Sequence, residues 1–131
     1  MRDQNHLLIN AKINNPTKDK EEAARFLNSF VLDLGMKSIT DPFVTYTERF
    51  GNRGISGNIM VEDGHIAFHI LDEETIASLQ LDIYVYQELE LSSLLSDLGK
   101  YFELIYTDWM LLNREKDLRV RAQGRITNKN D

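Results

Sequence analysis

The chain has 131 residues, of which 42% are hydrophobic and 27% charged, values that are typical of a single soluble globular domain. Its formal net charge of −6 makes a nucleic-acid partner unexpected, because such binding needs a basic surface that displaces phosphate counterions. The absence of cysteine excludes disulfides and thiolate sites, and no apolar run approaches the roughly 20 residues of a membrane helix. Since the N-terminus also lacks a signal peptide, we expect a cytoplasmic protein without a membrane or nucleic-acid partner.

The first half of the chain predicts a strand, a helix and a second strand. Alternating residues in His6 to Ile13 favour a strand, and a loop with turn residues follows it. A helix is expected from Glu21 to Leu34, since apolar residues recur there at helical spacing and Gly35 comes next. The following strand is expected to break or bend near Pro42, before the glycine-rich stretch at 51–57.

A β-hairpin is predicted in the stretch GISGNIMVEDGHIAFH, residues 54–69. Asp63 and Gly64 are a favoured two-residue turn between two alternating runs. The second run divides its side chains between two faces, with Ile66, Phe68 and Ile70 on one and His65, Ala67 and His69 on the other. One face of the hairpin is therefore suited to a core, and the other carries two histidines.

The second half of the chain adds a strand, a helix and a last strand. The run LQLDIYVY alternates most regularly, with Asp82, Tyr84 and Tyr86 opposite its aliphatic residues. A helix is expected from Leu91 to Tyr101, and YFELIYTDWMLL is interpreted as the last strand. From about residue 119 we expect a polar, mobile tail.

These elements predict an α+β fold in one domain that spans residues 1–131. Two amphipathic helices can cover one face of a mainly antiparallel sheet and so form a two-layer sandwich. The opposite face is neither fully apolar nor fully solvated, because it carries His65, His69, Asp82, Tyr84 and Tyr86. Such a face needs a second layer, a ligand or both, and we expect a homodimer, the commonest assembly.

The residues alone do not identify a chemistry for this mixed face. The glycines at 51–57 do not open a helix as a dinucleotide-binding loop would, and the acidic run Asp72–Glu74 is typical of a solvated loop. His65 and His69 point the same way but lie about 13 Å apart along a strand, too far to share one zinc ion. They can equally be polar residues with satisfied hydrogen bonds on a sheet, and no metal site is predicted.

The hairpin and the strand after it resemble the prokaryotic type of S-adenosylmethionine decarboxylase, the pyruvoyl enzyme of spermidine synthesis. The resemblance extends from His6 to about Arg114. The family pattern is Gly-(Val or Ile)-Ser-Gly, a short strand, Glu-Ser-His, a second histidine, and later a strand Asp-(Ile or Leu)-Phe-Thr-Cys. The order and spacing match here, although the connection after His69 is longer and lacks the family's Thr-Trp-Pro-Glu signature.

The resemblance assigns a role to each matching position. Family members cleave their own chain before a serine that becomes the pyruvoyl group, which holds the substrate as a Schiff base during decarboxylation. Gly64 matches that serine, and Asp63 matches the glutamate before it. The remaining matches are Ser56 and His69 for the two residues that assist processing, His65 for the histidine after the cleavage point, and Tyr86 for the catalytic cysteine.

Because glycine has no hydroxyl, the resemblance implies a chain that is not cleaved and carries no pyruvoyl cofactor. One function that follows is a non-catalytic binding or regulatory protein linked to polyamine metabolism, with S-adenosylmethionine or a related amine as its ligand. The alternative is an enzyme with changed chemistry in the inherited pocket, where His65, His69, Asp82 or Tyr86 acts as acid or base. The resemblance leaves both functions open.

The resemblance also predicts the geometry of the site. Ser56, His65, His69 and Tyr86 are expected to converge on one region with Gly64 at its rim, and Asp82 is expected to contact a ligand together with His65. Tyrosine is far larger than cysteine, so Tyr86 should fill part of the inherited space. We therefore expect a reduced pocket and weak or absent binding of S-adenosylmethionine.

Overall fold

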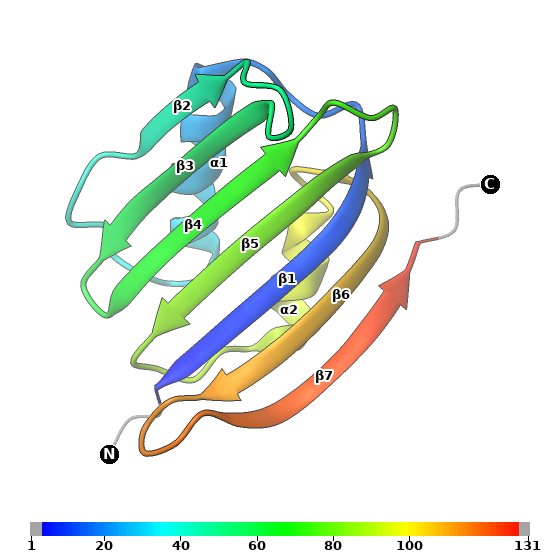
Figure 1. Ribbon diagram of the computed structural model, residues 1–131. Helices are drawn as coiled ribbons and strands as arrows, with labels where there is room; N and C mark the ends of the chain where they lie inside the picture. The colour runs from blue at the N-terminus through cyan, green and yellow to red at the C-terminus, as the bar shows by residue number, and fades with distance from the viewer. Residues whose placement is uncertain (1–3, 129–131) are drawn as a thin grey trace.

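Residues 4–128 of the computed structural model fold into one sheet and two helices (Figure 1). In chain order the elements are β1 (Asn5–Asn14), α1 (Lys20–Asp33), β2 (Phe43–Thr47), β3 (Gly54–Val61), β4 (Gly64–Leu71), β5 (Ala77–Val85), α2 (Leu91–Leu98), β6 (Glu103–Asn113) and β7 (Arg119–Thr127). Every strand and helix predicted before residue 114 is present, with bounds that differ by a few residues.

The sheet has the strand order β2-β3-β4-β5-β1-β6-β7, and every neighbouring pair is antiparallel. The first strand therefore lies between β5 and β6, while β2 and β7 form the edges. Both helices lie behind the same face, with α1 behind the β2–β3 side and α2 behind the β5–β1 side (Figure 1). The predicted α+β fold is confirmed. Within residues 4–128, neither helix is long and apolar enough to cross a membrane.

The hydrophobic core fills the space between the sheet and the helices. Alternate residues of the strands are buried, and Leu7, Ile66 and Leu79 have no exposed surface. From α1, the fully buried ring of Phe30 stacks on that of Phe26 with 5.3 Å between the ring centroids. Because strand side chains alternate, the neighbours of these core residues point to the opposite face, which no helix covers.

The first helix is held at both ends by carboxylates. Asp19 is the N-cap, and its side chain accepts hydrogen bonds from the backbone N–H groups of Glu21 (2.8 Å) and Glu22 (3.4 Å). At the other end, the carboxylate of Asp33 accepts a hydrogen bond from the hydroxyl of Tyr101, and this bond is the main cause that lowers the pKa of Asp33. The end of α1 is thereby tied to the turn that follows α2.

The β3–β4 hairpin turns one residue earlier than predicted. Val61 pairs with Gly64, so the turn consists of Glu62 and Asp63, and Gly64 is the first residue of β4. This register keeps the core isoleucines of the two strands opposite each other, whereas a slip of one residue would move every side chain to the other face. Burial of apolar side chains therefore overrides the preference for an Asp-Gly turn.

The prediction of a mobile tail from residue 119 is wrong for 119–127, which form β7. This strand pairs with β6 from Thr127 opposite Tyr106 to Arg119 opposite Asn113. Its sequence RVRAQGRIT alternates, but its apolar residues are few, and the polar composition suggested a tail. The sixth strand is consequently not the last one, and residues 129–131 of the predicted tail lie outside the described residues.

Candidate functional site

The face of the sheet that no helix covers carries the predicted site residues, and it is called the open face here (Figure 1). Strand pairing places polar side chains from neighbouring strands side by side on it. They include Ser56 from β3, His65 and His69 from β4, Gln80, Asp82 and Tyr84 from β5, His6 and Asn10 from β1, and Asp108 from β6.

At one end of the open face, Ser56 and His69 are opposite each other in the sheet. Ser56 Oγ lies 2.6 Å from His69 Nδ1, which is hydrogen-bonding distance. Imidazole is a base near neutral pH, so this contact suits the transfer of a proton between the hydroxyl and the ring. The Ser56–His69 pair is thus arranged for acid–base chemistry.

At the other end of the open face, the side chains of four residues surround Tyr84: His6, His65, Tyr86 and Arg114. These four residues and Tyr84 are called the Tyr84 cluster. The ring centroid of Tyr84 lies 5.8 Å from that of His6, 5.7 Å from that of His65 and 5.6 Å from that of Tyr86. The guanidinium carbon of Arg114 lies 4.9 Å from the same centroid, a cation–π contact. A hydrogen bond with Tyr86 is the largest cause that raises the pKa of Tyr84.

His6 belongs to this cluster but was not predicted as a site residue. Its Nδ1 lies 3.4 Å from Nη1 of Arg114, and its buried Nε2 has no hydrogen-bond partner among residues 4–128. Burial is the largest cause that lowers the pKa of His6, while Asp82 raises it and both Arg114 and His65 lower it. The ring is therefore neutral near pH 7.

The predicted site residues form two groups within one chain. His65 and Tyr86 belong to the Tyr84 cluster, which lies beside Gly64, whereas Ser56 and His69 form the pair at the other end. Gly64 and His69 are five residues apart in β4, which corresponds to about 16 Å along an extended strand. The expected convergence on one region does not occur within a single chain.

A cavity of about 620 Å³ opens on the open face. Its lining includes Leu8, His69, Asp82, Met110, Gln123 and Arg125. Asp108 also lines it and is held by Arg125 through two hydrogen bonds of 2.5 and 2.8 Å, which lower the pKa of Asp108. Asp82 has no ion pair within residues 4–128, so the cavity offers one unpaired carboxylate.

The lining of this cavity does not include Tyr86. The pocket was expected to be reduced because Tyr86 would fill the space of the family's cysteine. The ring of Tyr86 instead occupies space in the Tyr84 cluster, where it packs edge-on against Tyr84. The space available for a ligand on the open face is therefore set by other side chains.

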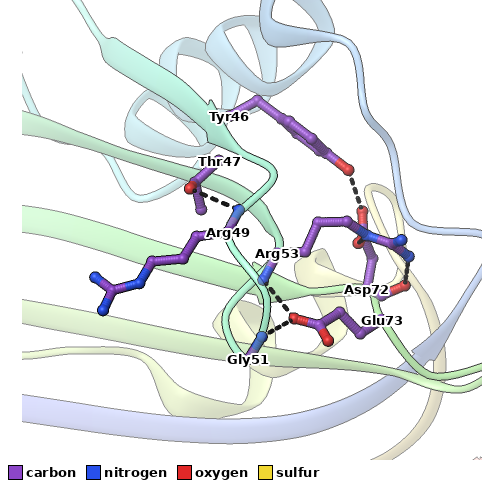
Figure 2. Close-up of polar contacts among 7 residues, drawn as sticks. All are labelled: Tyr46, Thr47, Arg49, Gly51, Arg53, Asp72 and Glu73. Carbon is purple, nitrogen blue, oxygen red and sulfur yellow. Dashed lines mark hydrogen bonds and ion pairs between the residues drawn. The ribbon is translucent and has the colours of Figure 1, made fainter.

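A polar network joins the β2–β3 loop to the β4–β5 connection (Figure 2). The buried carboxylate of Asp72 accepts hydrogen bonds from Arg53 Nε (2.7 Å) and from the hydroxyl of Tyr46 (3.1 Å). The carboxylate of Glu73 accepts bonds from two backbone N–H groups of the loop, at 2.6 and 2.9 Å. Contrary to the prediction of a solvated acidic loop, Asp72 is a structural residue that fixes the loop between β2 and β3.

The loop fixed by this network presents an aromatic ring to solvent. Phe50 lies near its tip and is 94% exposed. An exposed ring on a restrained loop is available for contact with a ligand or a partner.

Within residues 4–128, no three histidine or acidic side chains gather in a way that could hold a metal ion.

Gly64 lies directly against the neighbouring strand. A Cβ added to it would lie 1.8 Å from the carbonyl oxygen of Tyr84 and 2.7 Å from its carbonyl carbon. Both distances are far shorter than any non-bonded contact. The carbonyl of Asp63 accepts a hydrogen bond of 3.0 Å from the backbone N–H of Tyr86, which holds the two strands at this spacing. The position therefore has room for glycine alone.

Comparison with known protein families supports the resemblance seen in the hairpin. A model of the S-adenosylmethionine decarboxylase family matches residues 5–115, which is most of the chain. The chain belongs to the S-adenosylmethionine decarboxylase family. The match includes β1 to β6 and both helices and ends before β7. No curated protein matches the sequence.

S-adenosylmethionine decarboxylases of the pyruvoyl type make their cofactor from a serine of their own chain, and the residues present here do not fit that group. Gly64, which the resemblance assigns to this serine, has no hydroxyl and no space for a Cβ. Tyr86, assigned to the catalytic cysteine, packs its ring against Tyr84. No step through a pyruvoyl group follows from these residues.

Three residues of the open face were missed in the sequence, although signals existed for two of them, His6 and Arg125. His6 alternates with the buried Leu7, so its side chain points to the open face. Arg125 alternates with small and apolar residues in a run whose polar composition suggested a tail. Arg114 follows β6 directly, and only the pairing of β6 with β1 brings it to His6.

Proposed function

We propose that this member of the S-adenosylmethionine decarboxylase family is a binding or regulatory protein linked to polyamine metabolism, and that it does not decarboxylate through a pyruvoyl group. The crowding at Gly64 carries this proposal, because a Cβ there would lie 1.8 Å from a backbone oxygen. Self-cleavage would lack both its nucleophile and the space for it. A cytoplasmic location is proposed as well, since a chain without cysteine suits a reducing compartment.

The proposed ligand is a small cationic compound, S-adenosylmethionine or a related amine, in the cavity of the open face. Asp82 supports this ligand, because an unpaired carboxylate on a partly buried surface favours a cation. The volume of 620 Å³ lies within the range of roughly 300–1,000 Å³ that is typical of small-molecule sites. His65, the other predicted ligand contact, belongs to the Tyr84 cluster and could contact only a ligand that extends toward it.

A catalytic function with changed chemistry is the second candidate, and one contact favours it. Ser56 Oγ and His69 Nδ1 are 2.6 Å apart, and His69 lines the cavity. In this candidate His69 would act as the base that takes the proton of Ser56 or of a bound substrate. Turnover of S-adenosylmethionine that is lost in His69→Gln but kept in His65→Gln would favour this function over simple binding.

The purified protein is expected to remain a single chain of 15.2 kDa, because Gly64 cannot form the ester that precedes cleavage. Intact mass spectrometry checks this directly. Native spectra recorded with and without S-adenosylmethionine test binding in the same experiment, and an added mass equal to that of the ligand would support the proposed site over the weak or absent binding expected from the sequence. Two fragments that meet between Asp63 and Gly64 would contradict the proposal.

A homodimer formed through the open face is proposed because this face exposes apolar side chains. Phe43 is 66% exposed, Met60 45% and Tyr86 41%. A two-fold axis near the middle of the face would also bring the Ser56–His69 pair of one copy toward the Tyr84 cluster of the other. The two groups of site residues would then be completed across the interface, with the cavity enclosed between the two sheets.

Light scattering at micromolar concentration is expected to give twice the mass of the chain. Met60→Glu should shift the protein to a monomer, because it places a charge in the proposed interface. Leu32→Glu is the matched control, since Leu32 is 74% exposed on α1, on the opposite side of the sheet. A monomeric wild-type protein, or loss of the dimer in Leu32→Glu alone, would argue against this interface.

A further inference from the structure

A second cavity, of about 330 Å³, lies on the side of the sheet that carries the helices. Phe68 and Ile70 of β4 form its floor, and they alternate with His69, so their side chains point away from the open face. Its walls come from α1 and from residues 100–102, the connection between α2 and β6. No residue lines both this cavity and the one on the open face.

We propose that this second cavity binds a small molecule in which an aromatic ring is joined to a neighbouring carboxylate and ammonium group, as in an aromatic α-amino acid. The inference goes beyond the proposed function and does not depend on it, because the two cavities share no residue. The aromatic lining carries the first part of the proposal, and two charges at the rim carry the second.

The apolar part of the cavity is built from aromatic rings that pack against one another. The ring of Phe26 makes T-shaped contacts with those of Phe68, Tyr101 and Phe102, with 5.6, 5.1 and 4.8 Å between the ring centroids. Phe26 is 7% exposed and Phe68 1%, so the core fixes both rings. Because aromatic rings favour such edge-to-face contacts, the ring of a ligand would extend this arrangement. The volume is near the lower end of the range typical of small-molecule sites, roughly 300–1,000 Å³, and suits a single ring.

Two exposed side chains of α1, Glu22 and Arg25, place opposite charges at the rim of this cavity. Within residues 4–128, neither side chain makes an ion pair or a hydrogen bond. They are three residues apart in one helix, so their Cβ atoms are neighbours at about 5–6 Å. Lys100, the other charged residue of the lining, is already paired, since its Nζ lies 3.1 Å from Asp33 and 3.3 Å from Asp97.

The pair of rim charges matches the two charged groups of an α-amino acid. The guanidinium of Arg25 can bind a carboxylate through two parallel N–H···O hydrogen bonds, and the carboxylate of Glu22 can accept hydrogen bonds from an ammonium group. A ligand with one charged group would leave the other rim charge without a partner. Because both rim side chains are exposed, water weakens each of these contacts, and burial of the ring should supply most of the affinity.

Titration calorimetry with four probes tests this assignment: L-phenylalanine, L-alanine, which lacks the ring, 3-phenylpropanoate, which lacks the ammonium group, and phenethylamine, which lacks the carboxylate. L-Phenylalanine should bind most tightly, and L-alanine about tenfold more weakly or less. Arg25→Gln should weaken L-phenylalanine and 3-phenylpropanoate about fivefold and leave phenethylamine unchanged. Glu22→Gln should weaken L-phenylalanine and phenethylamine to a similar degree and leave 3-phenylpropanoate unchanged.

The matched controls are Lys20→Gln and Glu21→Gln, which make the same changes of charge at exposed positions of α1 outside the lining and should keep wild-type affinities. In methyl spectra of labelled isoleucine, Ile70 should shift on titration with L-phenylalanine. Ile66 should not, because it lies four residues earlier in β4, about 13 Å along the strand.

Three results would overturn the site: L-alanine that binds as tightly as L-phenylalanine, control variants that weaken binding as much as the rim variants, or a shift at Ile66 without one at Ile70. Failure of the wild-type protein to bind L-phenylalanine would overturn it as well. All of these results would leave the proposed function standing, because the intact mass of the chain tests that function separately.

Discussion

Replacing Asp72 by asparagine should lower the free energy of unfolding by about 1–3 kcal/mol. The carboxylate of Asp72 is 2% exposed and accepts side-chain hydrogen bonds from Arg53 and Tyr46. An asparagine has one acceptor oxygen, and its amide N–H groups would face one of these donors. Because the side chain of Arg53 is 37% exposed, water can solvate part of the released charge, and the loss should stay below that of a fully buried pair.

Urea unfolding followed by the fluorescence of Trp109, the single tryptophan, would measure this change. Asp117→Asn is the matched control, since its pair with Arg119 spans 3.9 Å and both side chains are more than three-quarters exposed. That variant should unfold within about 0.5 kcal/mol of the wild type. Equal stability of the two variants would show that the network in Figure 2 does not hold the β2–β3 loop.

The strands and helices could be predicted from the sequence because their side-chain alternation reflects burial directly. In β5, Leu79, Leu81 and Ile83 alternate with polar residues and are at most 1% exposed. The same alternation correctly assigned His65, His69 and Asp82 to the opposite face. A pattern with period two or 3.6 needs no knowledge of neighbouring strands, so it can be read along one chain.

The errors in the fold arose where a partner strand decides the local structure. Asp63-Gly64 is a favoured hairpin turn by itself, but the pairing of core residues across β3 and β4 moves the turn by one residue. The polar run at 119–127 forms a strand because it pairs with the backbone of β6 and because Arg125 forms an ion pair with Asp108 of that strand. Neither the register nor that ion pair is visible in the local sequence.

The composition of the site could be predicted better than its geometry. Strand alternation placed His65, His69 and Tyr86 on a single face, and the family resemblance placed Ser56 beside them, yet neither fixed their distances along that face. His69 is opposite Ser56, and His65 is opposite Tyr84. The separation of about 13 Å between His65 and His69 follows from the extended strand between them. The residue types in the motif therefore identified the face that carries the site. Only the sheet register shows that the site residues of one chain form two separate groups on that face.

Gly64→Ser should restore neither self-cleavage nor decarboxylation, and it should lower the free energy of unfolding by about 3 kcal/mol. A serine Cβ would lie 1.8 Å from the carbonyl oxygen of Tyr84, so β4 and β5 must move apart to accept it. Separation of the strands would weaken the backbone hydrogen bond between Asp63 and Tyr86.

Intact mass, release of labelled carbon dioxide from S-adenosylmethionine and urea unfolding together test the Gly64→Ser variant. Gly64→Ala separates the size of the side chain from its hydroxyl, and it should be destabilised to a similar degree because the clash arises at Cβ. Gly99→Ser is the matched control, since its added Cβ would meet only one atom, at 3.4 Å, and it should unfold within about 0.5 kcal/mol of the wild type. Release of labelled carbon dioxide by Gly64→Ser would mean that the β4–β5 backbone adapts to a serine and that the remaining residues still support the decarboxylase reaction.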